Sequence, residues 1–345
     1  MNLHPQLIID SCYFAAAFLF IYGLKRMSSP VTARSGIVVA GVGMLVATLA
    51  SFLYFFGVDD AARPYLTTNL WLAAGALGIG TGLSWWQGKR VPVTSMPQMV
   101  ALYNGMGGGA AAAIAAVELL RNVEHALVPL VVTVIGALIG SISLSGSLIA
   151  WAKLDGKIDK TWRMRGQQVL NGALFVATLA VGVYIVFLMD GHADPRIIGA
   201  FFAGALIFGV LMTMPIGGAD MPVVISLYNA FTGLAVGFEG YVLQNPALMI
   251  AGMVVGSAGT LLTLLMARAM NRSVANVIFS NFGVTGDEQQ GEIKGSMKPA
   301  DAADAAVNMR YASKVIIAPG YGLAVAQAQH KLYEFVQLLV DAGVD

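Results

Sequence analysis

Charge is what this sequence has least of. Lys, Arg, Asp and Glu make up 11% of its 345 residues, whereas hydrophobic residues make up 57%. Soluble domains carry about 25% charged residues, so this composition excludes an ordinary soluble protein and predicts one that lies mostly in a lipid bilayer. The formal net charge of +1 favours no acidic partner, and no stretch resembles a nucleic-acid-binding module.

Cysteine and histidine are also scarce. The single cysteine, Cys12, lies in an apolar segment, which excludes a disulfide framework and a cysteine metal site, and we expect no metal. Three of the four histidines (His4, His125 and His192) fall at ends or in outer loops, and His330 lies in the polar C-terminal region. We expect all four to be solvated. The first apolar run lacks the flanks of a cleavable signal peptide.

Long apolar runs fill residues 1–272, which we assign as one membrane domain. Nine segments are near the ~20 residues that a membrane-spanning helix requires. They are Leu7–Leu24, Gly36–Gly57, Leu66–Trp86, Met99–Leu119, Ala126–Ala152, Val169–Met189, Ile197–Met214, Pro222–Leu243 and Ala247–Met270. The sequence therefore predicts an all-α polytopic membrane protein with about nine transmembrane helices. Its forty glycines suit close helix–helix packing.

Basic residues alternate between the loops and predict the orientation of the chain. They gather in alternate loops, as Lys25, Arg26 and Arg34, then Lys89 and Arg90, then five between Lys153 and Arg165, and they end with Arg268 and Arg272; the short loop between Met214 and Pro222 has none. Positive residues mark the cytoplasmic side of a membrane protein. Nine spans then place the N-terminus outside and the C-terminus in the cytoplasm.

The composition changes after Arg272. Residues 281–303 are polar and without apolar periodicity, so residues 273–311 are expected to form a linker, with a short helix over Asp301–Tyr311. Residues 312–345 predict a strand over Lys314–Ala318, a turn over Pro319–Gly322 and a helix over Leu323–Val340. This is one βα unit, and a doubly wound domain needs more, so we expect a truncated Rossmann-like α/β unit.

The turn in this unit fits the dinucleotide-binding pattern G-x-G-x-x-G/A only loosely. Gly320 and Gly322 match the first two glycines, but Val325 fills the third small position after Ala324. A strand before and a helix after are the context that this motif requires, because the helix N-terminus supplies amides to a phosphate. An ordinary strand–turn–helix explains the same residues.

Asp220 is a carboxylate at the start of a membrane helix. Pro222 can begin a helix, since the amide that proline lacks would have no partner there, and the helix dipole then favours an anion at Asp220. An ionisable group at the boundary between water and hydrocarbon is a functional candidate. An acidic helix cap without further function has about equal weight on these residues alone.

Polar and small residues form three stripes within the membrane segments, at the spacing of one helix face. The stripes are Ser226, Asn229, Thr232 and Gly233; Gly136, Gly140, Ser143 and Ser147; and Asn104, Gly108 and Ala111. Plain helix packing is the commoner use of such residues. With Asp220 nearby, a hydrated path for a proton or ion is the favoured interpretation.

Glu239 is the other carboxylate within a late span. It lies about 25 Å along the helix from Pro222, at 1.5 Å per residue. This predicts a position near the outer surface, where Glu239 is either solvated or part of an exit from the path.

Three stretches carry a resemblance to a known family. Gly217–Asn229, Ala269–Ser273 and Val315–His330 resemble the β subunit of proton-translocating nicotinamide nucleotide transhydrogenase, and the likeness follows nearly the whole chain in order. It implies a Re/Si-specific enzyme that couples hydride transfer from NADH to NADP+ to inward proton translocation. The β subunit would bind NADP(H). An α subunit with extra membrane helices would bind NAD(H), in a dimer of αβ units in a bacterial inner membrane.

Site residues are carried over by position. The proton path and its coupling would use Asp220, Asn229, Asn104 and Ser147, and the nucleotide loop would use Gly320, Tyr321, Gly322, Leu323, Ala324, Val325 and Ala326. Many family members have a histidine where Asn104 stands, and an amide cannot carry a proton at neutral pH. Either a helix of the α subunit supplies a histidine, which we favour, or water and Asp220 suffice. Because most of the NADP domain is missing, the chain alone is expected to be inactive.

Two other classes of protein remain open on the residues alone. A transporter or channel gated by a nucleotide-sensing domain could have the same membrane part, and it would place its substrate site at broken helices in matching halves. No convincing internal repeat is present. The other alternative is an assembly subunit whose polar faces only pack.

Overall fold

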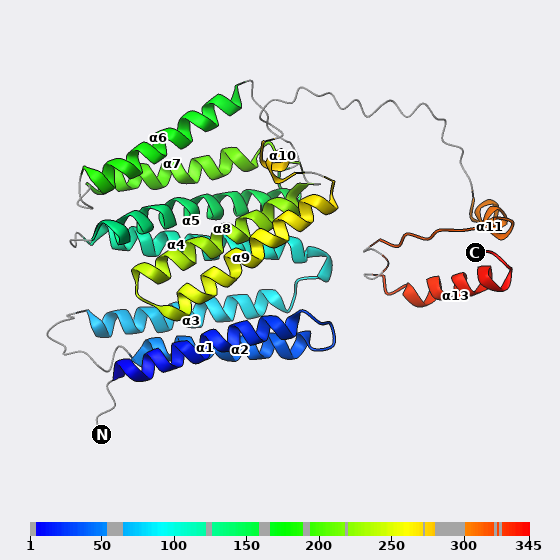
Figure 1. The fold of residues 1–345 in the computed structure, drawn as a ribbon, viewed down its shortest axis with the longest axis horizontal. Coiled ribbons are helices and arrows are strands. Elements are labelled where there is room, and N and C mark those ends of the chain that lie inside the picture. The colour runs from blue at the N-terminus through cyan, green and yellow to red at the C-terminus, as the bar shows by residue number, and fades with distance from the viewer. Residues whose placement is uncertain are drawn as a thin grey trace. The chain divides into compact units, whose positions relative to one another are not determined.

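The computed structural model describes residues 5–53, 65–121, 126–158, 166–188, 194–217, 220–271, 273–279, 301–320, 323 and 326–345. The chain forms two compact units (Figure 1). The first ends at Gly283, and the second consists mainly of residues 284–345. The change from one unit to the other falls inside the stretch 273–311. The two units are described separately below.

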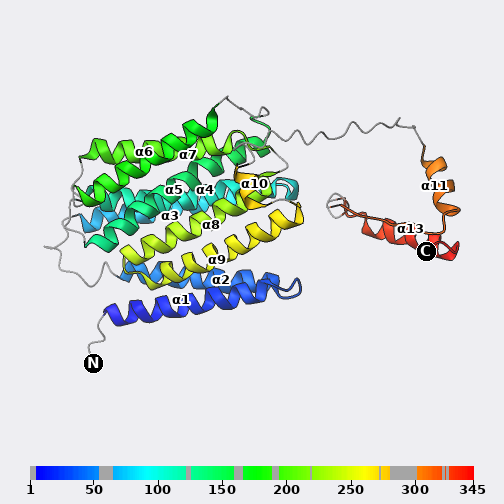
Figure 2. The same ribbon diagram turned by 45° about the horizontal axis from the view of Figure 1, so that its top comes forward.

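Each of the nine apolar segments forms a long helix in the first unit. They are α1 (Pro5–Met27), α2 (Ala33–Phe52), α3 (Leu66–Gly88), α4 (Met96–Leu120), α5 (Leu127–Leu154), α6 (Gln167–Phe187), α7 (Pro195–Thr213), α8 (Met221–Val242) and α9 (Pro246–Ala269). A short 3-10 turn, η3 (Val93–Ser95), precedes α4, and α10 (Val274–Phe279) follows α9. The long helices run side by side in both views (Figures 1 and 2).

Eight of these nine helices are long and apolar enough to cross a membrane. The exception among the described residues is α3, so the prediction of nine spans is shown for eight. Its length of 23 residues suffices. Its composition falls short because Thr67, Thr68 and Asn69 follow its first leucine and Trp85 and Trp86 stand near its end.

Glycine lets the helix backbones touch at two seams. Between α8 and α9, a Cβ added at Gly252 would lie 2.2 Å from the backbone nitrogen of Gly237, and one added at Gly233 would lie 2.3 Å from that of Gly256. A smaller contact of the same kind joins α4 to α5, where a Cβ added at Gly140 would lie 2.7 Å from the Gly108 carbonyl oxygen. Backbones pack this closely only where side chains are absent.

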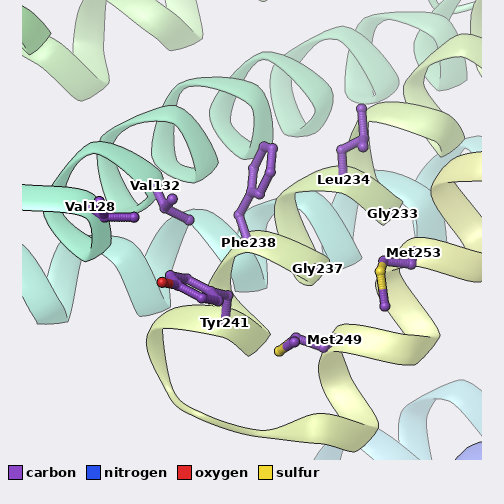
Figure 3. A pocket seen from close by; sticks show the side chains of 9 residues that line it. All are labelled: Val128, Val132, Gly233, Leu234, Gly237, Phe238, Tyr241, Met249 and Met253. Atoms are coloured by element: carbon purple, nitrogen blue, oxygen red, sulfur yellow. The ribbon is translucent and has the colours of Figure 1, made fainter.

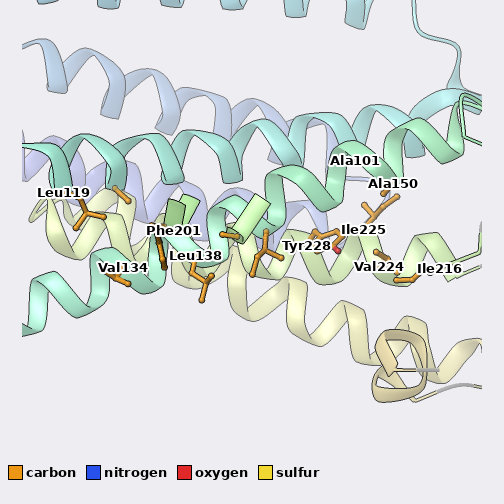
Figure 4. Close-up of a cluster of buried hydrophobic side chains, with 14 of the residues drawn as sticks. Ala101, Leu119, Val134, Leu138, Ala150, Phe201, Ile216, Val224, Ile225 and Tyr228 are labelled. Atoms are coloured by element: carbon orange, nitrogen blue, oxygen red, sulfur yellow. The ribbon is translucent and has the colours of Figure 1, made fainter. Parts of the chain in front are cut away.

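Helix α5 lies at the centre of the bundle and contacts α4, α6, α7 and α8. The buried apolar side chains of these helices form one core, which includes Leu138 and Phe201 (Figure 4). Tyr228 of α8 is fully buried, and its ring fills the space beside Gly146 of α5, where a Cβ would lie 2.3 Å from the ring. The first two helices pair with each other, and α1 also contacts α9.

Helix α3 contributes no buried residue to the described core. A Cβ added at Gly75, Gly78, Gly80 or Gly82 would meet no atom within 4 Å. Glycine in a helix interior costs about 1 kcal/mol relative to alanine, and elsewhere in this bundle it allows backbones to touch. On α3 the described part of the chain provides no such contact.

The second unit contains two helices and no strand among its described residues. α11 (Ala302–Arg310) begins at Asp301, whose carboxylate accepts a hydrogen bond from the Asp304 amide at 2.8 Å. This confirms the short helix predicted there. The stretch 314–320 has no regular structure. Of the helix predicted over Leu323–Val340, Leu323 is helical and α13 (Gln329–Asp341) covers the later part.

The strand predicted over Lys314–Ala318 is therefore wrong for this structure. A strand needs a neighbouring ladder. The nearest equivalent is a pair of backbone hydrogen bonds at the chain end, from the Val315 amide to the Asp345 carbonyl (2.7 Å) and from the Asp345 amide to the Ser313 carbonyl (3.2 Å). The Rossmann-like unit is accordingly not seen in the described residues.

Candidate functional site

Asp220 stands at the N-cap of α8, as its sequence context predicts. The cap residue is followed by Met221 and by Pro222 in the first turn. Its carboxylate makes no hydrogen bond to the amides of that turn, and its side chain is partly exposed. A helix-capping hydrogen bond would by itself explain an acidic residue at this position, and the Asp220 side chain does not make that bond.

Side chains from three helices meet inside the bundle and form what we call the polar seam: Asn104 of α4, Ser143 and Ser147 of α5, and Thr232 of α8. The Asn104 amide nitrogen donates to Ser147 Oγ at 3.1 Å. Ser143 Oγ and Thr232 Oγ1 are 2.6 Å apart. Both serines are fully buried. The seam thus lies within the bundle, with no charged group of its own.

The two hydroxyl groups at the centre of the seam have more partners than protons. Ser143 Oγ is placed to donate to the Tyr228 carbonyl at 3.0 Å, and Thr232 Oγ1 to the Asn104 carbonyl at 3.2 Å. Their own contact needs a third proton, whereas each hydroxyl carries one. Only two of the three bonds form at any moment, so the donors can switch.

The third predicted stripe, on α8, does not stay together. Ser226 turns to α9, where it accepts from Thr263 Oγ1 at 3.0 Å and donates to the Gly259 carbonyl at 3.4 Å. Six residues separate Ser226 from Thr232, which places them roughly 120° apart around a helix. Asn229 lies between them, half-buried, and makes no side-chain bond to the seam. The prediction of one face was therefore wrong.

Glu239 is not solvated, which corrects one of the two readings of the sequence. Its side chain is 0% exposed, and neither carboxylate oxygen has a hydrogen-bond partner. It sits against Gly136 of α5, where an added Cβ would lie 2.5 Å from Glu239 Oε1. A buried carboxylate without partners is costly. The position of glutamate here thus needs a reason other than packing.

Sequence patterns missed a second hydroxyl pair. Tyr228 OH lies 2.5 Å from Thr213 Oγ1, at the end of α7. Thr213 Oγ1 also reaches the Gly209 carbonyl at 2.7 Å. An aromatic residue in an apolar helix is usually a core residue, so the sequence does not single out Tyr228. The one local signal is Gly146 on α5, whose missing side chain leaves room for the tyrosine ring. Tyr228 thereby ties α8 to α7 across α5.

A separate cavity of about 310 Å³ opens between α5, α8 and α9 (Figure 3). It is lined by Val128, Val132, Gly233, Leu234, Gly237, Phe238, Tyr241, Met249 and Met253. These side chains are almost all apolar and none is charged. Such a lining offers a proton few positions to occupy, so the polar seam is the better candidate path.

The predicted nucleotide loop is only partly described. Tyr321, Gly322, Ala324 and Val325 lie outside the described residues, while Gly320, Leu323 and Ala326 lie within them. A Cβ added at Gly320 would meet nothing within 4 Å, so its backbone is open to a ligand. Leu323 is helical, its neighbours on both sides lie outside the described residues, and α13 begins at Gln329. The role of this loop in nucleotide binding therefore stays a prediction.

No group of three or more His, Cys, Asp or Glu side chains suited to a metal occurs in the part of the chain that the structure describes. The fold and the seam define a polytopic helical membrane protein with a hydroxyl- and amide-lined interior and an acid at each end of one inner helix.

Comparison with known proteins identifies the family. Residues 9–345 match the family model described as NAD(P) transhydrogenase beta subunit. Two sequences of NAD(P) transhydrogenase subunit beta from Rhodospirillum rubrum are each 38% identical over 349 residues, covering 97% of this chain and 72% of the relative. The chain belongs to the NAD(P) transhydrogenase beta-subunit family.

Proposed function

We propose that this β subunit works in a Re/Si-specific transhydrogenase complex and couples hydride transfer from NADH to NADP+ to inward proton translocation. Family membership supports the reaction. The single observation that supports the path is the polar seam, in which Asn104, Ser143, Ser147 and Thr232 join three helices inside the bundle. The seam lies along α8, between Glu239 near one end and Asp220 at the other.

Each end of the path has a carboxylate with a distinct task. Glu239 is buried without a hydrogen-bond partner, so an uncharged, protonated side chain suits this position and can hold a proton that arrives from the outer side. Ser143 and Thr232 pass hydrogen-bond direction by switching donors, which is how a proton moves along a chain of hydroxyls and waters. Asp220 is partly exposed, so it can release that proton to the cytoplasm.

Asn104 lies in the proposed path but cannot carry a proton, so a group from another subunit is needed there. Its amide orients Ser147 through the 3.1 Å bond but cannot itself take up a proton near neutral pH. Its side chain is half-buried, so a titratable group from a neighbouring chain can reach it. We propose that a membrane helix of the α subunit supplies a histidine at this point.

The loop charges support a particular membrane arrangement. We propose that α3 also spans the bilayer, that the N-terminus lies outside and that the C-terminus lies in the cytoplasm of a bacterial inner membrane. The open glycines of α3 support further helix contacts in the complex, because glycine on a lipid-facing helix has no packing role. A dimer of αβ units is the assembly that we propose.

The nucleotides belong to the parts of the complex outside the bundle. NADP(H) would be held by the second unit of this chain through the loop from Gly320 to Ala326, and NAD(H) by the α subunit. NADP+ supplies the nicotinamide ring that accepts the hydride. Asp220 would transmit the state of the second unit to the seam, as a two-state coupling requires. Without its partner, the chain would not turn over.

The experiment is reconstitution with the α subunit in sealed vesicles. NADH-dependent reduction of an NADP+ analogue should be accompanied by proton movement that collapses with an uncoupler. Reduction without proton movement would mean that the polar seam only packs helices. Proton or solute movement that needs nucleotide binding but no hydride transfer would indicate a gated channel instead.

A further inference from the structure

Lys153 connects two parts of the bundle that the proposed path needs to hold together. It lies in the last turn of α5. Its ammonium donates to the carbonyls of Thr213 (3.3 Å) and Ile216 (2.8 Å) and also to that of Met214. All three carbonyls belong to the end of α7 and the turn that leads to α8.

The charge of Lys153 suits this place for two reasons. The last carbonyls of a helix have no partner within the helix, and both α5 and α7 end here, so the negative ends of two helix dipoles face the ammonium. A lysine ammonium carries three donors on a compact charge. Three carbonyls can therefore take the place of water around a half-buried cation.

The clamped segment leads directly to Asp220. Ile216 is buried at 3% exposure, and the Gly217 carbonyl next to it accepts the Asp220 amide at 3.1 Å. On the other side, Lys153 follows Ser147 by six residues along the same helix, α5. The Lys153 side chain thus fixes the turn that precedes Asp220 relative to α5, the helix that carries Ser143 and Ser147.

Two glutamines at the same end of the bundle also form hydrogen bonds between helices and serve as a comparison. Gln98 of α4 donates to the Leu154 carbonyl of α5 at 3.0 Å. Gln167 of α6 donates to the Leu211 carbonyl of α7 at 3.1 Å. Each joins one helix to another. The hydrogen bonds described for the two glutamines end on helix residues, whereas those of Lys153 reach Ile216 in the turn before Asp220.

We infer that Lys153 is a positioning residue for proton coupling, which keeps Asp220 in register with Ser143 and Ser147. The inference rests on the proposed function and adds Lys153 to the residues on which that function depends. Removing the ammonium frees the turn before Asp220 from α5. Asp220 then no longer biases the seam, so hydride transfer continues while proton movement no longer accompanies it.

The test uses the complete complex in vesicles, with Lys153→Met and the matched control Gln167→Met. Protons moved per hydride transferred and the melting temperature are both measured. We expect Lys153→Met to lower the ratio at least about fivefold, the lower end of typical coupling, with hydride transfer within twofold of wild type. Gln167→Met should keep the ratio, although it also removes a bond to α7.

A wild-type ratio in Lys153→Met, or an equal loss in Gln167→Met, would overturn the inference. If Lys153→Met does not fold, Lys153→Gln takes its place, because its amide keeps two of the three donors. That variant should fold and give an intermediate ratio, and an unchanged ratio would also overturn the inference. Failure of the proposed function itself is distinct: the wild-type complex would then move no protons with hydride.

Discussion

Ser143 Oγ and Thr232 Oγ1 lie 2.6 Å apart between α5 and α8, and each also faces a backbone carbonyl. Because the two hydroxyls share two protons among three contacts, neither has a fixed donor role. This is the property that separates a relay from a static tie between helices, and it can be tested one hydroxyl at a time.

Thr232→Val removes the hydroxyl and keeps the side-chain shape. We expect proton translocation to fall about tenfold, which corresponds to about 1.4 kcal/mol and to the loss of one hydrogen bond. Thr232→Ser should restore most of the rate. Proton uptake is followed with a pH-sensitive dye in vesicles. Wild-type uptake by the valine variant would show that the hydroxyl only packs.

Ser147→Ala removes the acceptor of the Asn104 amide. We expect slower proton movement, and in a double-mutant cycle with Asn104→Ala the two losses should not add, because either change breaks the same bond. Rates of proton uptake from the two single variants and the double variant give the coupling. Additive losses would mean that the two residues act separately.

Gly252→Ala places a Cβ 2.2 Å from the Gly237 backbone nitrogen. Forcing the two helices apart should destabilise the purified subunit by about 1–3 kcal/mol, seen as a lower melting temperature in detergent. Gly78→Ala on α3 is the control, since nothing lies within 4 Å of that Cβ. It should be neutral or stabilising. Equal losses in both variants would contradict the close α8–α9 contact.

Glu239→Gln keeps the shape of the side chain and removes its titration. Because neither carboxylate oxygen has a partner in the structure, we expect unchanged or higher thermal stability. Proton translocation should nevertheless fall strongly, as a glutamine cannot hold and release a proton. Measuring both quantities separates the roles. Full translocation by the variant would remove Glu239 from the path.

Local patterns predicted the parts of this fold that depend on local physics. The helices follow the apolar runs, and Asp220 stands at the N-cap because Pro222 and its neighbours define a helix start. The stripes on α4 and α5 meet, as Asn104 and Ser147 show. Eight of the nine expected spans have the length and hydropathy to cross a membrane.

Features that depend on a facing element could not be read from the chain alone. The sequence predicts Glu239 near the outer surface, because nothing local shows that Gly136 of α5 leaves room for its side chain. The sequence shows Lys153 only as a basic loop residue, since its carbonyl partners lie 60 or more residues away along the chain. The strand over Lys314–Ala318 failed because a strand needs a ladder that the described residues do not provide.

The most direct test of the central claim is Asp220→Asn in the complete complex. The asparagine keeps the size of the side chain and removes both its negative charge and its capacity to take up a proton. The account predicts that the variant binds NADP(H) with unchanged affinity, while hydride transfer in vesicles no longer moves protons. Normal proton movement per hydride in this variant would contradict it.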